Sequence, residues 1–108
     1  MTVKEIANLL EGEIISYEDN ERYASDVYIC DLLSFAMAKV KEDYIWLTIQ
    51  GNVNVVGVAS LTDALCVVIC EGVIPNEETI ETAKRENITI ITCKKSTYEA
   101  ATILYGKM

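Results

Sequence analysis

The sequence has no histidine, so it lacks the side chain that most often performs general acid–base catalysis. Such catalysis would fall to carboxylates, lysine, tyrosine or cysteine. The sequence has four cysteines, namely Cys30, Cys66, Cys70 and Cys93. No two of them form a CxxC pair, so a zinc or iron–sulfur site would need all four to converge from separate elements. We therefore predict structural cysteines, no metal and no cofactor.

Glycine is too sparse to build either of two common nucleotide-binding loops. The five glycines stand at positions 12, 51, 57, 72 and 106. This spacing cannot form GxGxxG, and it cannot form GxxxxGK followed by serine or threonine. A nucleotide-hydrolysing enzyme of either standard type is therefore not expected.

Long apolar runs are also missing. No run reaches the roughly 18 to 20 residues that a membrane-spanning helix needs. The first residues, MTVKEIANLLEGE, carry acids where a signal peptide has a cationic region followed by an apolar one. We therefore expect a cytoplasmic protein.

Positive charge is scarce. Nine lysines and arginines face 17 acidic residues, which gives a net charge of −8. The basic run Lys94-Lys95 is too short for a nucleic-acid footprint, and no longer basic run occurs. We expect no binding to nucleic acid or to an anionic membrane surface.

Apolar residues, by contrast, are abundant. They make up 51% of the 108 residues, which is rich for a small domain, because small domains leave a larger share of their surface exposed. We predict one domain over residues 1–108 that meets another subunit through part of its apolar surface.

The pattern along the chain predicts an α/β fold. A capping box at Thr2-Val3-Lys4-Glu5 opens a helix that Gly12 should end, and short extended pieces follow at 13–17 and 23–30. After a helix at 32–40, the chain alternates between expected strands (44–49, 65–70 and 88–93) and expected helices (52–64, 77–87 and 96–107). These strands are continuous β-branched runs, typical of parallel strands covered on both faces. We predict a small three-layer domain with a parallel or mixed sheet of about four to five strands.

The helix at 32–40 has almost no polar face. Asp31 is placed to cap it, and a helix that is apolar nearly all round must be buried on more than one side. In so small a domain this predicts a partner subunit, most simply in a two-fold homodimer. The candidate interface residues are Asp31, Leu32, Leu33, Phe35, Ala36, Met37 and Val40.

Ligands of parallel α/β sheets collect beyond the carboxyl ends of the strands. Two of the loops expected there lead into helix N-termini, whose free amides favour anions. The candidate ligand-binding residues are Gln50, Gly51, Asn52, Asn54, Glu71, Gly72, Thr92, Lys94, Ser96 and Thr97. The plainer alternative is that Gly51 supplies a turn and that Asn52 and Ser96 only cap helices.

Catalytic residues are harder to find, and we predict no enzymatic activity. The alternative is a small phosphoryl- or acyl-transfer enzyme that uses Glu71 and Lys94. A carboxylate followed by glycine, however, is typical of a solvated turn. Cys93 has lysines nearby that could lower its pKa, but it has no histidine base.

Several short motifs occur in an order that resembles the DRTGG-domain family over nearly the whole chain. The segments that show this resemblance are DVYICDLLSFAM, WLTIQGNVNVVGVA, CVVICEGVIPNEETIETAKRENITIITC and STYEAATILY. Arg22 fits the segment that gives the family its name. Ser25-Asp26-Val27, however, stands where that segment has threonine and two glycines, so this chain departs from the family at that glycine turn.

The resemblance implies a regulatory role, with chemistry located elsewhere. The family is similar to the N-terminal, non-kinase domain of HPr kinase/phosphorylase. It also occurs between paired CBS modules in some pyrophosphatases and beside phosphotransacetylase domains. The resemblance therefore implies assembly, sensing of a small anionic metabolite such as a nucleotide, and a partner enzyme or regulatory protein.

Overall fold

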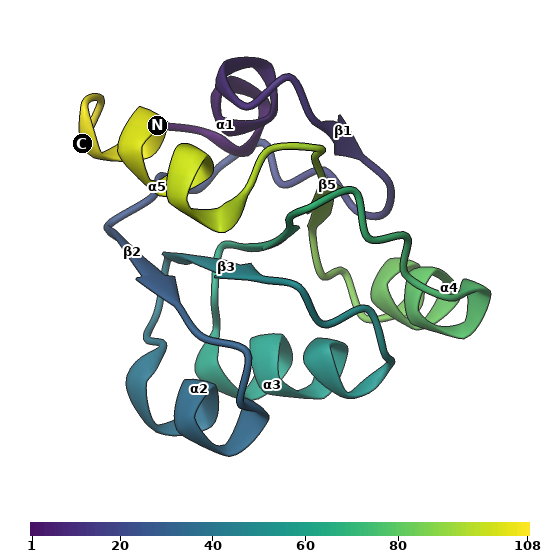
Figure 1. The fold of residues 1–108 in the computed structure, drawn as a ribbon. Coiled ribbons are helices and arrows are strands. Elements are labelled where there is room, and N and C mark those ends of the chain that lie inside the picture. Colours follow the sequence, from purple (N-terminus) through teal and green to yellow (C-terminus); the bar gives the residue numbers. More distant parts are fainter.

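A five-stranded mixed sheet forms the centre of the computed structural model, which describes residues 1–108 (Figure 1). The strands are β1 (Glu13–Ile14), β2 (Asp26–Ile29), β3 (Tyr44–Thr48), β4 (Cys66–Ile69) and β5 (Ile90–Thr92). Their order across the sheet is β1-β5-β4-β3-β2. Strands β2 to β5 are parallel, and β1 pairs antiparallel with β5. The predicted α/β fold is confirmed, and the sheet is mixed.

Helices cover both faces of the sheet. The helices are α1 (Val3–Leu9), α2 (Leu33–Lys39), α3 (Asn54–Thr62), α4 (Glu77–Arg85) and α5 (Thr97–Tyr105). Figure 1 shows α1 and α5 on one face and α2, α3 and α4 on the other. The domain therefore has three layers, as the alternation of strands and helices predicts.

The two faces of the sheet bury separate hydrophobic clusters. In β3, Ile45 and Leu47 join the cluster beneath α1 and α5, whereas Trp46 joins the cluster beneath α2 and α3. All three side chains are fully buried. Because successive residues of a strand point to opposite faces, a strand covered on both sides has to be apolar at every position.

Two predicted helix ends are wrong. Helix α1 ends at Leu9, and Glu11, not Gly12, adopts the left-handed conformation (φ 53°). Gly12 is needed for a different reason, because a Cβ there would lie 2.7 Å from the Thr92 carbonyl oxygen. Asp31 does not cap α2 either, since the N-cap residue is Leu32 and no side chain caps this helix.

Arg22 holds the amino-terminal edge of the sheet together. Its Nε donates to Asp43 Oδ1 (2.8 Å), its Nη1 to Asp63 Oδ1 (3.1 Å) and its Nη2 to the Asp63 carbonyl oxygen (2.8 Å). Burial lowers the pKa of Arg22, but the Asp43 hydrogen bond and the charges of Asp63, Asp43 and Asp19 raise it above its usual value. The guanidinium thus ties residues 19–25 to the turns before β3 and after α3.

Helix α2 is only partly buried within the single chain. Ala36 and Val40 lie in the core, and Leu33 packs against the same cluster. Leu32 and Phe35, however, expose more than half of their surface, and Met37 exposes 42%.

None of the helices has the length and apolar character that crossing a membrane requires.

Candidate functional site

A cavity of about 620 Å³ opens at the carboxyl ends of β4 and β5. Three segments and one residue of α4 line it: residues 10–13 with Ile15 around β1, residues 72–75 after β4, residues 92–95 from the end of β5 onward, and Ile80. Of the predicted ligand residues, it contains Gly72, Thr92 and Lys94. The rule that ligands gather at strand ends therefore leads to this cavity, although it predicts only part of the lining.

Backbone hydrogen bonds fix the two loops that form the mouth of the cavity. The Glu71 N–H donates to the Lys95 carbonyl (2.8 Å), and the Gly72 N–H donates to the Cys93 carbonyl (2.9 Å). Glu71 and Gly72 both have positive φ (63° and 70°), a conformation that glycine adopts at little cost. The loop after β4 is thus a tight turn pinned to its neighbour, with the Glu71 side chain exposed.

The charged groups of the cavity nearly balance. Lys95 Nζ lies 3.1 Å from Glu11 Oε1 and forms an ion pair with it. Lys94 is exposed and takes part in none of the four ion pairs of the protein, while Glu13 adds a second carboxylate to the lining. An anion entering here would meet one free ammonium group and a second one shared with a carboxylate.

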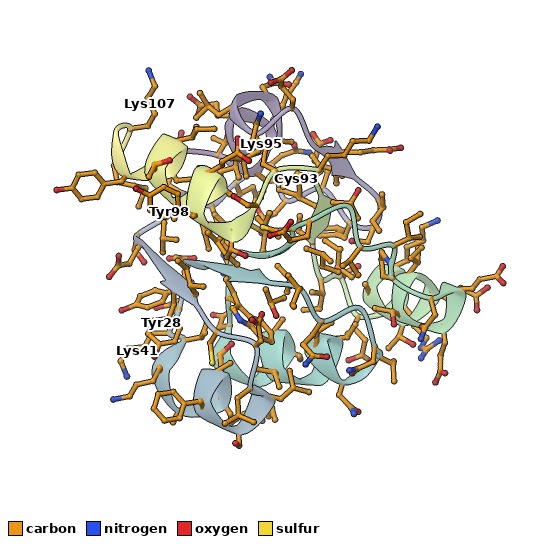
Figure 2. The ribbon with its side chains drawn as sticks, in the orientation of Figure 1. Tyr28, Lys41, Cys93, Lys95, Tyr98 and Lys107 are labelled. Atoms are coloured by element: carbon orange, nitrogen blue, oxygen red, sulfur yellow. The ribbon has the colours of Figure 1, made fainter.

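The other lining residues are not among the predicted ligand residues, although Cys93 and Lys95 belong to a loop expected at this edge. They are Leu10, Glu11, Gly12, Glu13, Ile15, Val73, Ile74, Pro75, Ile80, Cys93 and Lys95. Figure 2 shows Cys93 and Lys95 at the same end of the sheet. The residues before β1 reach the cavity only because β1 pairs with β5 in the antiparallel direction, which no local pattern indicates.

The predicted residues that follow β3 lie in a different place and hydrogen-bond to one another. Asp31 Oδ1 accepts from Thr48 Oγ1 and from the Ile49 N–H, both at 2.9 Å. Gln50 Nε2 donates to the Asp31 carbonyl (2.9 Å), and Asn52 Nδ2 donates to Gln50 Oε1 (3.1 Å). The carboxylate of Asp31, expected to cap α2, instead fastens the end of β3.

The turn at Gly51 packs against the loop that leads into α4. Its carbonyl accepts from Thr79 Oγ1 (2.9 Å), and a Cβ at Gly51 would lie 3.1 Å from Pro75 Cα. Asn52 Oδ1 accepts from the Asn54 N–H (2.9 Å) at the start of α3. Residues 50–54 thus lie behind the 73–75 segment, and they do not line the cavity.

Ser96 and Thr97 begin α5 just after the cavity loop. Ser96 Oγ accepts from the Glu99 N–H (3.1 Å), and Glu99 Oε1 accepts from the Ser96 N–H (3.2 Å). This reciprocal pair is a capping box. The prediction that Ser96 caps a helix is confirmed, and its hydroxyl already has a partner.

A second hollow, of about 900 Å³, lies between edge strand β2 and helix α5. Its lining includes Tyr28, Tyr98, Tyr105 and Met108. Figure 2 shows Tyr98 on the α5 side and Tyr28 beside β2. The sequence gives no signal for this hollow, because helix α5 and strand β2 are far apart in the chain.

No group of three histidine, cysteine, aspartate or glutamate side chains is placed to hold a metal ion. The carboxyl edge offers ammonium groups, carboxylates, backbone amides and thiols. Such a set can bind a small anion and can exchange electrons through sulfur.

Comparison with known proteins gives one family and a similar fold. The model of the DRTGG domain matches residues 5–106. A solved structure of the CBS and DRTGG domains of the regulatory region of Clostridium perfringens pyrophosphatase, complexed with the activator diadenosine tetraphosphate, superposes with a TM-score of 0.78. The identity is 19%, and the alignment covers 95% of this chain and 45% of that one. This chain therefore corresponds to less than half of that solved chain, and no curated protein matches it.

Proposed function

The chain belongs to the DRTGG domain family, and we propose from this that it is a non-catalytic regulatory domain that forms dimers and binds a small anionic metabolite. The family match is the observation that supports a regulatory role. The similar pyrophosphatase region is regulatory and was solved with a nucleotide activator. We propose the same class of ligand here, a nucleotide or other phosphate metabolite, with a cytoplasmic enzyme or regulatory protein as partner.

The cavity at the ends of β4 and β5 is the best-supported place for such an anion. Lys94 is free to pair with it, whereas Lys95 first has to leave Glu11. An exposed ion pair of this kind contributes only about 0–1 kcal/mol, so a phosphate group can displace it. With so few cationic contacts in a protein of charge −8, binding should be micromolar or weaker, about −8 kcal/mol at best.

Thermal unfolding with inorganic phosphate, ATP and diadenosine tetraphosphate tests this proposal. A ligand at 100 times its Kd stabilises the folded state by about 2.7 kcal/mol, so the melting temperature should rise measurably. Lys94→Ala should weaken the shift, and Glu11→Gln should strengthen it by releasing Lys95. Glu81→Gln, an exposed change on α4, is the matched control for the lost negative charge.

Asn52→Ala distinguishes the two candidate anion sites at this edge of the sheet, which are the cavity at the ends of β4 and β5 and the turn after β3. Its side chain bonds within the 50–54 turn, so the substitution should leave the ligand-induced shift unchanged. A shift lost in Asn52→Ala and retained in Lys94→Ala would move the site to the turn after β3. No shift with any of the three ligands would contradict the sensing role.

The dimer is proposed through the outward side of α2. Leu32, Phe35 and Met37 are the exposed members of the predicted interface, whereas Ala36 and Val40 are buried within the chain. Phe35→Glu should convert a dimer to a folded monomer in light scattering. Leu61→Glu, at a more exposed apolar residue of α3 (75%), should leave it dimeric. A wild-type monomer at micromolar concentration would contradict the dimer.

The competing function is a small transferase that uses Glu71 and Lys94. Both side chains are exposed at the mouth of the cavity, where water is not excluded from them. We therefore expect no turnover of nucleotides or phosphoesters. Reproducible turnover that disappears in Glu71→Gln would favour the enzyme.

A further inference from the structure

Cys70 and Cys93 follow directly after two neighbouring parallel strands. In the register of β4 and β5, Ile69 lies opposite Thr92, so the next residues along the two strands are the cysteines. The Cys93 N–H donates to the Ile69 carbonyl (3.0 Å), and its own carbonyl accepts from the Gly72 N–H (2.9 Å). Cys93 is thus held on both sides against the segment that contains Cys70.

The two side chains point to the same face of the sheet. Both belong to the buried cluster beneath α1 and α5. Adjacent strands lie about 4.8 Å apart, and disulfides join Cα atoms that are about 4.4–6.8 Å apart. The backbone therefore already holds these cysteines at a separation that a disulfide spans.

The two thiols differ in how close they lie to the cavity. Cys93 lines the cavity of about 620 Å³ and exposes 4% of its surface, whereas Cys70 is not part of that lining and is fully buried. Figure 2 shows Cys93 at the end of the sheet where Lys95 lies. A reagent that enters the cavity meets Cys93 first and finds Cys70 behind it.

The surroundings also make the two thiols unequal in acidity. Interaction with the Cys70 thiol lowers the pKa of Cys93; burial opposes this, and the backbone and charge of Lys95 lower it further. Interaction with Cys93, followed by burial, raises the pKa of Cys70. Because the thiolate is the nucleophile, Cys93 is suited to attack and Cys70 to act second.

We propose that Cys70 and Cys93 form a redox site in which a small-molecule disulfide such as glutathione disulfide converts the two thiols into an intramolecular disulfide. The Cys93 thiolate attacks one sulfur of glutathione disulfide, whose S–S bond breaks and releases a glutathione thiolate. Cys70 then loses its proton to that thiolate and attacks the Cys93 sulfur of the mixed disulfide, which releases a second glutathione. The protein loses two electrons and two protons, and one glutathione disulfide becomes two glutathiones.

The other two cysteines provide internal contrasts. Cys66 is fully buried, and burial raises its pKa to about 12. Cys30 is partly exposed, and its Sγ donates to the Leu32 carbonyl (3.2 Å). Neither lines the cavity. A reaction confined to Cys70 and Cys93 would therefore reflect their placement and not the general reactivity of thiols.

Peptide mapping of the wild-type protein after treatment with glutathione disulfide tests the proposal directly. We expect a product lighter than the reduced protein by two hydrogen atoms, with one cross-linked peptide pair that joins Cys70 to Cys93. Dithiothreitol should reverse the product. Cross-links to Cys30, stable glutathione adducts on the wild-type cavity thiol, or four free thiols at the end would each overturn the proposal.

Two substitutions assign the order of attack. Cys70→Ala should stop the reaction at a glutathione adduct on Cys93, and Cys93→Ala should slow modification at Cys70 at least about tenfold. The wild-type measurement does not depend on the folding of either variant. These experiments measure only disulfide formation and glutathione adducts. Failure to bind a phosphate metabolite would therefore not contradict the redox site. Failure to form the disulfide would likewise not contradict the anion-binding proposal.

Discussion

Gly12 and Gly57 differ in the space that an added methyl group would find. A Cβ at Gly12 would lie 2.7 Å from the Thr92 carbonyl oxygen, whereas a Cβ at Gly57 would meet nothing within 4 Å. We expect Gly12→Ala to destabilise the fold by about 1–3 kcal/mol, because the start of β1 must move away from β5. Gly57→Ala, inside α3, should stabilise it by about 0.5–1 kcal/mol. Urea denaturation measures both, and equal effects would contradict the packing at Gly12.

Cys66 should make stability depend on pH in the alkaline range. Burial raises the pKa of its thiol from 9.0 to about 12. Between these values the unfolded chain loses a proton that the folded protein keeps, so the free energy of unfolding falls as pH rises. The slope due to this one group approaches about 1.4 kcal/mol per pH unit, and well below pH 9 this slope vanishes because the thiol is protonated in both states.

Urea denaturation of the wild type and of Cys66→Ala, under reducing conditions at pH 8 to 11, tests this expectation. The variant should lose stability at every pH because it leaves a small cavity. Its loss between pH 9 and 11 should nevertheless be shallower than that of the wild type. Parallel curves would show that Cys66 ionises equally in both states.

The Arg22 side chain joins its own loop to the turn before β3 and to the turn after α3. Lysine cannot reproduce its fork of bonds to Asp43 and to both the side chain and the carbonyl of Asp63. The Arg22 side chain is one-third exposed, so solvent screens the pairs, and we expect Arg22→Lys to cost only about 1 kcal/mol. Arg85→Lys, at an exposed arginine near the end of α4, is the control in urea denaturation. Equal losses would mean that the fork contributes nothing.

The strands of the sheet centre could be predicted from sequence because their signal is local. Apolar runs such as Cys66–Ile69 need no information from elsewhere in the chain, and the structure shortens each expected strand by only one to three residues. Strand β1, however, keeps only Glu13 and Ile14 of the five residues expected at 13–17. Its antiparallel pairing with β5 depends on contacts between distant parts of the chain.

The same distinction explains which site residues could be predicted. Thr92 and Lys94 follow a recognisable strand, so the strand-end rule finds them. Glu11 and Lys95 come together across most of the chain length, and no spacing indicates that contact. The position of Asp31 before a helix predicts a cap, but the Thr48 hydroxyl at the end of β3 and the following Ile49 N–H bind its carboxylate instead.

On the scale of the whole molecule, two regions each gather several exposed apolar side chains, while others, such as Leu61 and Ile74, lie elsewhere on the surface. Leu32, Phe35 and Met37 lie on α2, and Tyr98 and Tyr105 lie on α5 beside edge strand β2. Each region is rich enough in apolar surface to favour contact with another protein surface. The composition thus predicts the excess of apolar surface, whereas its location requires the three-layer arrangement.

Net charge should control how strongly two copies associate. Each copy carries −8, so the proposed apolar α2 contact would form against long-range repulsion, which salt screens over about 10 Å at 0.1 M and about 3 Å at 1 M. We therefore expect the dimer Kd to fall severalfold between 0.05 and about 0.5 M sodium chloride in sedimentation equilibrium. Phe35→Glu should stay monomeric at every salt concentration. A dimer that weakens as salt rises would instead be held by ion pairs, and the apolar side of α2 would not be its interface.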